Sequence, residues 1–213
     1  MLDPRLIVVT DRKMIQNSSN IPFLEVVRSV AFSGATMIQL REKNIETIEF
    51  LKLAEEVNKA LLGSDCSLVI NDRLDIALVS DANGVHFGQD DLLLPNAKKI
   101  VKSNFIFGVS ASNRVLGEIA IRDGASYIGV GPTFTTKSKD TDRVPIGPEG
   151  LKKMVDYFPN FPIVAIGGIN IKNIEKVLES GVSGVAVIAA IMNSPSPEKS
   201  CVEMRKIIDE VIK

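Results

Sequence analysis

The chain repeats one pattern along its length: a short apolar run, a turn, and a longer stretch in which apolar residues recur every three or four positions. Most of the short runs are continuously apolar, as in parallel strands that are buried on both faces. The longer stretches have the spacing of amphipathic helices. The predicted strands are Leu6–Thr10, Met37–Leu40, Leu68–Ile70, Gly84–Phe87, Phe105–Val109, Tyr127–Val130, Ile163–Ile166 and Gly184–Ile188. The predicted helices are Ile21–Phe32, Ile45–Leu62, Leu74–Ser80, Pro95–Lys102, Arg114–Asp123, Pro148–Tyr157, Ile171–Glu179 and Pro197–Ile212.

Glycines support these boundaries. Gly34, Gly63, Gly124 and Gly181 each follow a predicted helix and precede a strand, and a helix commonly ends in the left-handed conformation that glycine adopts easily. Eight strand–helix units within 213 residues favour a closed (β/α)8 barrel, or TIM barrel, over an open doubly wound sheet. No linker interrupts the chain, so we expect a single α/β domain that spans residues 1–213.

Composition narrows the range of functions. The chain has 25 Lys and Arg against 26 Asp and Glu and no basic stripe, so it lacks the features of a nucleic-acid-binding protein. No apolar run approaches the roughly 18 residues of a membrane span, and the N-terminus lacks the pattern of a secretory signal. Cys66 and Cys201 have no metal-ligand spacing and are interpreted as reduced thiols. We expect a cytoplasmic protein that acts on small molecules, with neither nucleic acid nor membrane as a partner. The sequence leaves the oligomeric state open, a homo-oligomer included.

Polar residues gather where the predicted strands end, which is where the active site of such a barrel lies. The second strand contains Gln39 and leads into Arg41 and Lys43, and alternation along an extended chain places all three on one side. Two cations and an amide suit an anionic ligand such as a pyrophosphate. A solvated strand end would explain the same charges.

Two carboxylates follow neighbouring strands. Asp72 comes directly after the third predicted strand, beside Asn71, and Asp91 follows the fourth. Mg²⁺ prefers oxygen ligands and often combines one or two carboxylates with substrate phosphates, so this pair predicts a magnesium site. The alternative is that Asp72 caps the helix that follows it.

The segment GPTFTTKSK, residues 131–139, begins a long polar loop that carries Thr136, Ser138 and Lys139. Hydroxyls, main-chain amides and a lysine can surround a phosphate, and a long loop after a strand is a candidate lid. We expect the stretch 134–143 to close over bound ligand. A flexible connection would have the same composition.

A second phosphate site is predicted after the last two strands. Gly168 belongs to a glycine pair at the end of the seventh strand, and Ile188 and Ala189 follow the eighth. Barrels often bind phosphate at this place, through main-chain amides that glycine leaves accessible. A glycine pair is also common in ordinary turns.

The single histidine, His86, lies inside a predicted strand, where a structural role is more common than a catalytic one. A general-base role stays open because imidazole titrates near neutral pH. Zinc chemistry is not expected without a second histidine or a nearby cysteine, and no Ser–His–acid triad can be placed.

Seven segments together resemble the thiamine-phosphate synthase family. They are QLREK at 39–43, ND at 71–72, GVHFGQDD at 84–91, GVS at 108–110, GPTFTTKSK at 131–139, IGGI at 166–169 and GVAVIAAI at 184–191. They occur in the family's order and with its spacing, and they span most of the chain.

The resemblance implies a Mg²⁺-dependent transferase that joins a hydroxymethylpyrimidine pyrophosphate to a hydroxyethylthiazole phosphate. Pyrophosphate leaves first, and the thiazole nitrogen then captures the pyrimidine methylene cation. By the same resemblance, the pyrimidine pyrophosphate is bound by Gln39, Arg41, Lys43 and Asn71. Asp72 and Asp91 hold Mg²⁺. Arg41, Ser110 and Lys139 carry the catalytic roles on the leaving pyrophosphate, and the thiazole phosphate is surrounded by Thr136, Ser138, Gly168, Ile188 and Ala189.

This chain departs from the family pattern at two positions. Ser138 stands where the family usually has threonine, which keeps the hydroxyl. Ala189 stands where many members have serine. If that serine's hydroxyl binds phosphate, the loss weakens thiazole phosphate binding by about 0.5–1.5 kcal/mol, one net hydrogen bond.

Two other functions stay open. The thiazole tautomerase is a relative on the same barrel that needs no Mg²⁺, but it carries a catalytic histidine where this chain has Ser112. A barrel that binds a phosphorylated ligand without turnover is the third possibility, because a fold does not fix a function.

Overall fold

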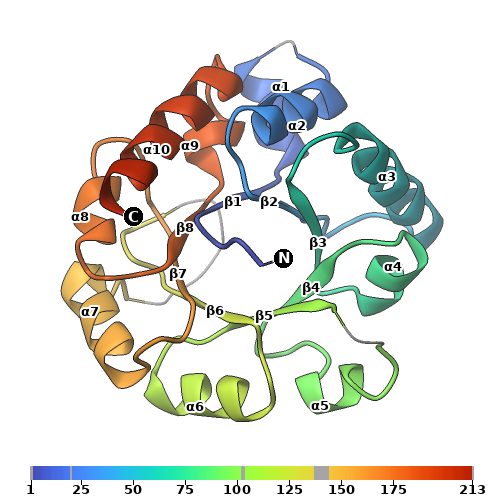
Figure 1. Cartoon of the computed structure of the whole chain (residues 1–213). Helices are drawn as coiled ribbons and strands as arrows, with labels where there is room; N and C mark the ends of the chain where they lie inside the picture. Colours follow the sequence, from blue (N-terminus) through green and yellow to red (C-terminus); the bar gives the residue numbers. More distant parts are fainter. Residues whose placement is uncertain (1, 20, 102–103, 137–143, 213) are drawn as a thin grey trace.

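The computed structural model describes residues 2–19, 21–101, 104–136 and 144–212. Eight parallel strands form a closed barrel in which each strand pairs with the next along the chain and β8 returns to β1 (Figure 1). The strands are β1 Leu6–Val9, β2 Met37–Leu40, β3 Ser67–Asn71, β4 Gly84–Phe87, β5 Ile106–Ser110, β6 Tyr127–Val130, β7 Ile163–Ile166 and β8 Gly184–Val187. The (β/α)8 barrel predicted from the sequence is therefore confirmed.

Helices surround the barrel on the outside (Figure 1). They are α1 Arg12–Ser18, α2 Phe23–Phe32, α3 Thr47–Ala60, α4 Leu74–Val79, α5 Leu94–Ala97, α6 Arg114–Arg122, α7 Gly147–Tyr157, α8 Ile174–Leu178, α9 Ala189–Met192 and α10 Pro197–Val211. Gly34, Gly63, Gly124 and Gly181 have φ values of 115°, 86°, 91° and 87°, which confirms their predicted role after helices.

Every predicted strand lies within one residue of an observed one, because a buried parallel strand leaves a continuous apolar run in the sequence. The helices differ more. The predicted helix Pro95–Lys102 is replaced by the shorter α5, after which Lys99 and Ile100 donate to carbonyls three residues back. The predicted start at Ile171 is wrong because Asn170 and Asn173 fold a polar turn first: the Asn170 Oδ1 accepts from Lys172 N at 2.9 Å.

Two short helices were not predicted. The first, α1, is capped by Asp11, whose side chain accepts from the backbone N–H of Met14 at 3.1 Å. The second, α9, begins at Ala189, where the sequence suggested the end of the eighth strand. Both are too short for apolar periodicity to mark them. They pack against each other, and Ser18 Oγ donates to the Met192 carbonyl at 3.2 Å.

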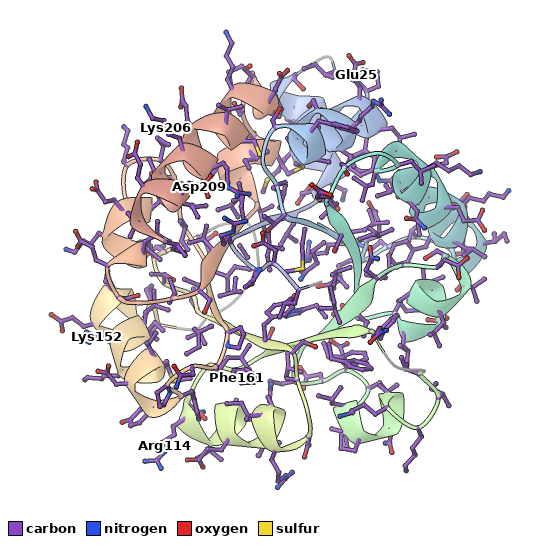
Figure 2. All side chains as sticks on the ribbon, in the orientation of Figure 1. Glu25, Arg114, Lys152, Phe161, Lys206 and Asp209 are labelled. Carbon is purple, nitrogen blue, oxygen red and sulfur yellow. The ribbon has the colours of Figure 1, made fainter. Side chains whose placement is uncertain are left out.

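Side chains fill the barrel interior (Figure 2), while labelled charged residues such as Glu25 and Lys152 point outward from the helices. The buried core is mostly Val, Ile, Leu and Ala, as expected for a parallel sheet covered on both faces. Cys66 and Cys201 are buried and free, and burial raises the pKa of each thiol to about 12. Within the part of the chain that the structure describes, no helix has the length and apolar character needed to cross a membrane.

Candidate active site

A cavity of about 960 Å³ opens at the C-terminal ends of the strands, and residues from or after all eight strands line it. That volume is at the upper end of small-molecule sites. The residues expected at the site that line the cavity are Arg41, Lys43, Asn71, Asp72, Asp91, Ser110, Thr136, Gly168, Ile188 and Ala189. Gln39 does not line it: its side chain is buried. Ser138 and Lys139, and most of the expected lid at 134–143, fall outside the described residues.

Asp72 and Asp91 meet at one side of this cavity. Their carboxyl groups lie within hydrogen-bonding reach of each other. Asp72 Oδ2 also accepts from Lys43 Nζ at 2.5 Å, and Asp91 Oδ2 accepts from the backbone N–H of Gly88 at 2.6 Å. The alternative role for Asp72 is not observed, because the N-cap of α4 is Arg73 and no side chain caps that helix.

The pKa values of the two carboxyls are shifted in opposite directions. Burial raises the pKa of Asp91, and the neighbouring Asp72 raises it further. Burial also disfavours ionisation of Asp72, but the hydrogen bonds from Lys43 and Asp91 outweigh it, so the pKa of Asp72 is lowered. Lys43 offsets part of the repulsion between the two carboxylates, and a further positive charge would stabilise the pair when both are ionised.

This donor set fits a hard divalent cation. The carboxylate oxygens of Asp72 and Asp91 are the kind of ligand that Mg²⁺ prefers, and a bound cation would offset the repulsion between the two groups. Among the described residues no group of three or more His, Cys, Asp or Glu side chains could hold a metal. Two protein carboxylates suffice for Mg²⁺ when substrate phosphates and water complete its coordination.

Arg41 brings another positive charge to the same cavity. It lines the cavity, and its Nε is buried with no hydrogen-bond partner among the residues that the structure describes. A buried donor without an acceptor costs about 1–3 kcal/mol, which an anionic ligand would recover. The neighbouring Glu42 is paired with Arg12 at 2.7 Å.

Ser110 is held at the end of β5 by contacts from β4 and the loop after it. Its Oγ lies 3.0 Å from His86 Nε2, and its main-chain carbonyl accepts from Gln89 Nε2. The other ring nitrogen of His86 lies 3.0 Å from the hydroxyl of Tyr127. The sequence pattern did not identify Tyr127 as part of the site. Its hydroxyl is nevertheless a signal, because a hydroxyl in an otherwise apolar buried strand needs a hydrogen-bond partner.

The opposite side of the cavity is built from main chain. Gly167 and Gly168 have φ values of 101° and 67°, and a Cβ on Gly168 would lie 2.7 Å from the Thr135 carbonyl oxygen. Phe134 N donates to the Gly167 carbonyl at 2.9 Å, so the loops after β6 and β7 pack backbone against backbone. Main-chain groups can therefore approach a ligand closely here, as at a phosphate site.

The unpredicted helices contribute two lining residues that the sequence did not single out. Met14 comes from α1, and Asn193 follows α9. Figure 1 shows the two helices next to each other beside β1 and β8. They close the cavity where the barrel joins its first strand to its last.

Residues 6–191 match the protein-family model described as thiamine monophosphate synthase. The chain is similar to a thiamine-phosphate synthase of Pyrococcus furiosus, with 40% identity over 208 residues that cover 98% of this chain and 96% of the relative. A thiamine-phosphate synthase of Clostridium tetani is 39% identical over 210 residues, 98% of each chain. A solved structure of thiamine phosphate pyrophosphorylase from Pyrococcus furiosus superposes with a TM-score of 0.88 at 37% identity, covering 99% of this chain and 98% of that one. A 3-hexulose-6-phosphate synthase, at 17% identity and a TM-score of 0.71 over 95% of this chain and 99% of that one, shares the fold.

Proposed function

The chain belongs to the thiamine monophosphate synthase family, an enzyme family that makes thiamine phosphate, and we propose the substrates, the metal and the residue roles of its reaction. The substrates are hydroxymethylpyrimidine pyrophosphate and hydroxyethylthiazole phosphate, and the products are thiamine phosphate and pyrophosphate. The observation that carries the proposal is the Asp72–Asp91 pair beside Lys43, because it is suited to a cation and a pyrophosphate together.

In the proposed first step, the bond between the pyrimidine methylene carbon and the pyrophosphate oxygen breaks, and the electron pair leaves with pyrophosphate. Arg41 and Lys43 stabilise the charge on the leaving group, and Asn71 and Ser110, which line the same cavity, donate hydrogen bonds to it. The proposal includes Lys139, which lies outside the described residues. Mg²⁺, held by Asp72 and Asp91, would neutralise the pyrophosphate oxygens when bound.

In the second step, the lone pair of the thiazole nitrogen forms a bond to the methylene cation and gives the thiazolium product. This step needs no general base, so what the protein supplies is position. We assign the thiazole phosphate to Gly168, Ile188, Ala189 and Thr136, and to Ser138 in the part of the loop that the structure does not describe. Gln39 is buried rather than lining the cavity, and we assign it to the support of the site.

One assay separates this proposal from its rivals. Purified protein is incubated with the pyrimidine pyrophosphate and the thiazole phosphate, with and without Mg²⁺, and both pyrophosphate and thiamine phosphate are measured. We expect both products in equal amounts, and only with Mg²⁺. Isomerisation of a thiazole without pyrophosphate release would identify a tautomerase instead, and ligand binding without turnover would identify a binding protein.

A further inference from the structure

Four polar side chains form a continuous chain of contacts from the barrel interior to the cavity. The Gln39 side chain lies near the Tyr127 hydroxyl, and that hydroxyl lies 3.0 Å from His86 Nδ1. His86 Nε2 lies 3.0 Å from Ser110 Oγ. Gln39 and Tyr127 are buried, whereas His86 and Ser110 line the cavity. These residues come from β2, β6, β4 and β5, so the contacts cross the barrel interior.

A glycine makes room for the central contact. Gly108 lies on β5, between the strands of His86 and Tyr127. A Cβ at Gly108 would collide with His86 Nδ1 and with the Tyr127 hydroxyl. The histidine and the tyrosine therefore meet across a strand that has no side chain in their way.

The direction of each hydrogen bond follows from the number of donors. Tyr127 has one proton of its own, and its side chain is fully buried. A buried hydroxyl that donates to nothing is costly, and His86 Nδ1 is the acceptor within reach among the described residues.

We propose that Tyr127, through His86, fixes the Ser110 hydroxyl as a hydrogen-bond donor toward the cavity. When Nδ1 accepts from Tyr127, the neutral imidazole carries its proton on Nε2. That proton is donated to Ser110 Oγ, so the serine proton cannot point back at the ring. Ser110 lines the cavity, so its hydroxyl is free to donate a hydrogen bond to an anionic oxygen that is bound there.

This assignment makes Tyr127 and His86 positioning residues for the proposed reaction, and it rests on the proposed function only for the identity of the ligand. The opposite tautomer would have Nε2 accept from Ser110 and turn the hydroxyl away from a phosphate. The tyrosine thus selects which of the two serine orientations the ligand meets. Fixing a tautomer through its second ring nitrogen is a general use of buried hydrogen bonds to histidine.

The test uses the fact that His86 is the only histidine in the chain. In ¹⁵N-labelled protein without tag histidines, a long-range ¹H–¹⁵N spectrum at about pH 8, above the ordinary imidazole titration, assigns the tautomer directly. We expect an unprotonated Nδ1 and a protonated Nε2 in the wild-type protein without substrate. A protonated Nδ1 would overturn the proposal.

The matched variants are Tyr127→Phe and Tyr157→Phe, which change the two tyrosines of the chain. Tyr157 is half exposed and lies outside the cavity lining. We expect Tyr127→Phe to lose the single tautomer and to lower kcat about tenfold, the low end for removing an outer-shell partner, with a smaller change in either KM. Tyr157→Phe keeps the wild-type spectrum and kcat. Wild-type kcat in a folded Tyr127→Phe protein would contradict the proposal.

The two measurements separate this inference from the proposed function. If the wild-type protein forms no thiamine phosphate, the proposed function fails, while the spectrum still decides the direction of the hydrogen bonds. If Tyr127→Phe does not fold, the wild-type spectrum alone decides it.

Discussion

The carboxyl of Asp72 lies within hydrogen-bonding reach of that of Asp91, and the pKa values of the two groups move in opposite directions. Asp72 has a left-handed backbone, with a φ of 66°, and its N–H donates to the His86 carbonyl at 2.8 Å. This geometry directs the third strand's carboxylate toward the loop after the fourth. Two like charges held this close form a site that a divalent cation stabilises.

The first prediction concerns this pair. Asp72→Asn should lower activity at limiting Mg²⁺ by about 10² or more, because one ligand oxygen becomes a neutral amide and charge stabilisation of the leaving group is lost. Asparagine tolerates the left-handed backbone at this position, so the protein should fold. The measurement is pyrophosphate release over a Mg²⁺ titration.

Asp65→Asn is the matched control. Asp65 is exposed and precedes the same strand at its opposite end. It should keep wild-type activity at every Mg²⁺ concentration. An Asp72→Asn protein with the wild-type Mg²⁺ requirement would remove the metal assignment.

The second prediction concerns Arg41. Arg41→Ala should slow pyrophosphate departure by about 10²-fold or more, by analogy with the loss of one donor to a developing anion. The KM for thiazole phosphate should change much less, because that substrate is assigned to the opposite side of the cavity. Steady-state kinetics with each substrate varied in turn measures both effects. Arg122→Ala is the control, because the Arg122 side chain is exposed and paired with Asp123. If Arg41→Ala changed only the KM for thiazole phosphate, Arg41 would serve that substrate instead.

The third prediction concerns Gly168. Gly168→Ala should raise the KM for thiazole phosphate, because the new Cβ meets the Thr135 carbonyl oxygen at 2.7 Å and moves the main chain. Gly63→Ala is the control. Gly63 also has a positive φ, of 86°, but the nearest atom to a Cβ built there belongs to Phe32 and lies 3.9 Å away. Each should lose about 1–3 kcal/mol of stability from the strained backbone, and only Gly168→Ala should change the KM. Equal KM values in the two variants would show that this glycine is not part of the phosphate site.

The fourth prediction concerns stability and pH. Asp3 pairs with Arg5 at 2.6 Å. Burial alone would raise the pKa of Asp3, but the hydrogen bonds from Arg5 outweigh burial, so the pKa of Asp3 is lowered. A carboxyl with a lowered pKa in the folded state stabilises the protein above its unfolded pKa, and this contribution is lost as the pH falls through the folded value. Because the pair is partly exposed, Asp3→Asn should cost only about 0.2–1 kcal/mol near neutral pH.

Urea unfolding of Asp3→Asn and wild type at neutral pH and at about pH 2 measures this effect. The difference in free energy of unfolding between the two proteins should vanish at the lower pH, where aspartic acid and asparagine at position 3 are both uncharged. Asp156→Asn, which breaks an exposed pair with Lys152, should have a smaller effect at neutral pH. A difference that persists unchanged in acid would assign the loss to packing instead.

The sequence by itself determined the barrel and the edge where the site lies. Apolar runs such as Tyr127–Val130 and Ile163–Ile166 match observed strands at both ends, because burial on both faces leaves few polar positions in a strand. In a parallel barrel all strands end at the same rim. Asp72 and Asp91 could therefore be placed together from their positions after two strands, without knowledge of their distance.

The tertiary structure alone decided which polar groups pair inside that rim. Alternation along a strand indicates whether a side chain faces inward, but not what it meets across the barrel. Gln39 was expected to contact the substrate, yet its side chain is buried and lies near Tyr127 from another part of the barrel. His86 reaches that tyrosine only because Gly108 leaves space between them. Such contacts depend on the closure of the sheet and on the volume of distant side chains, and no periodicity along the chain contains that information.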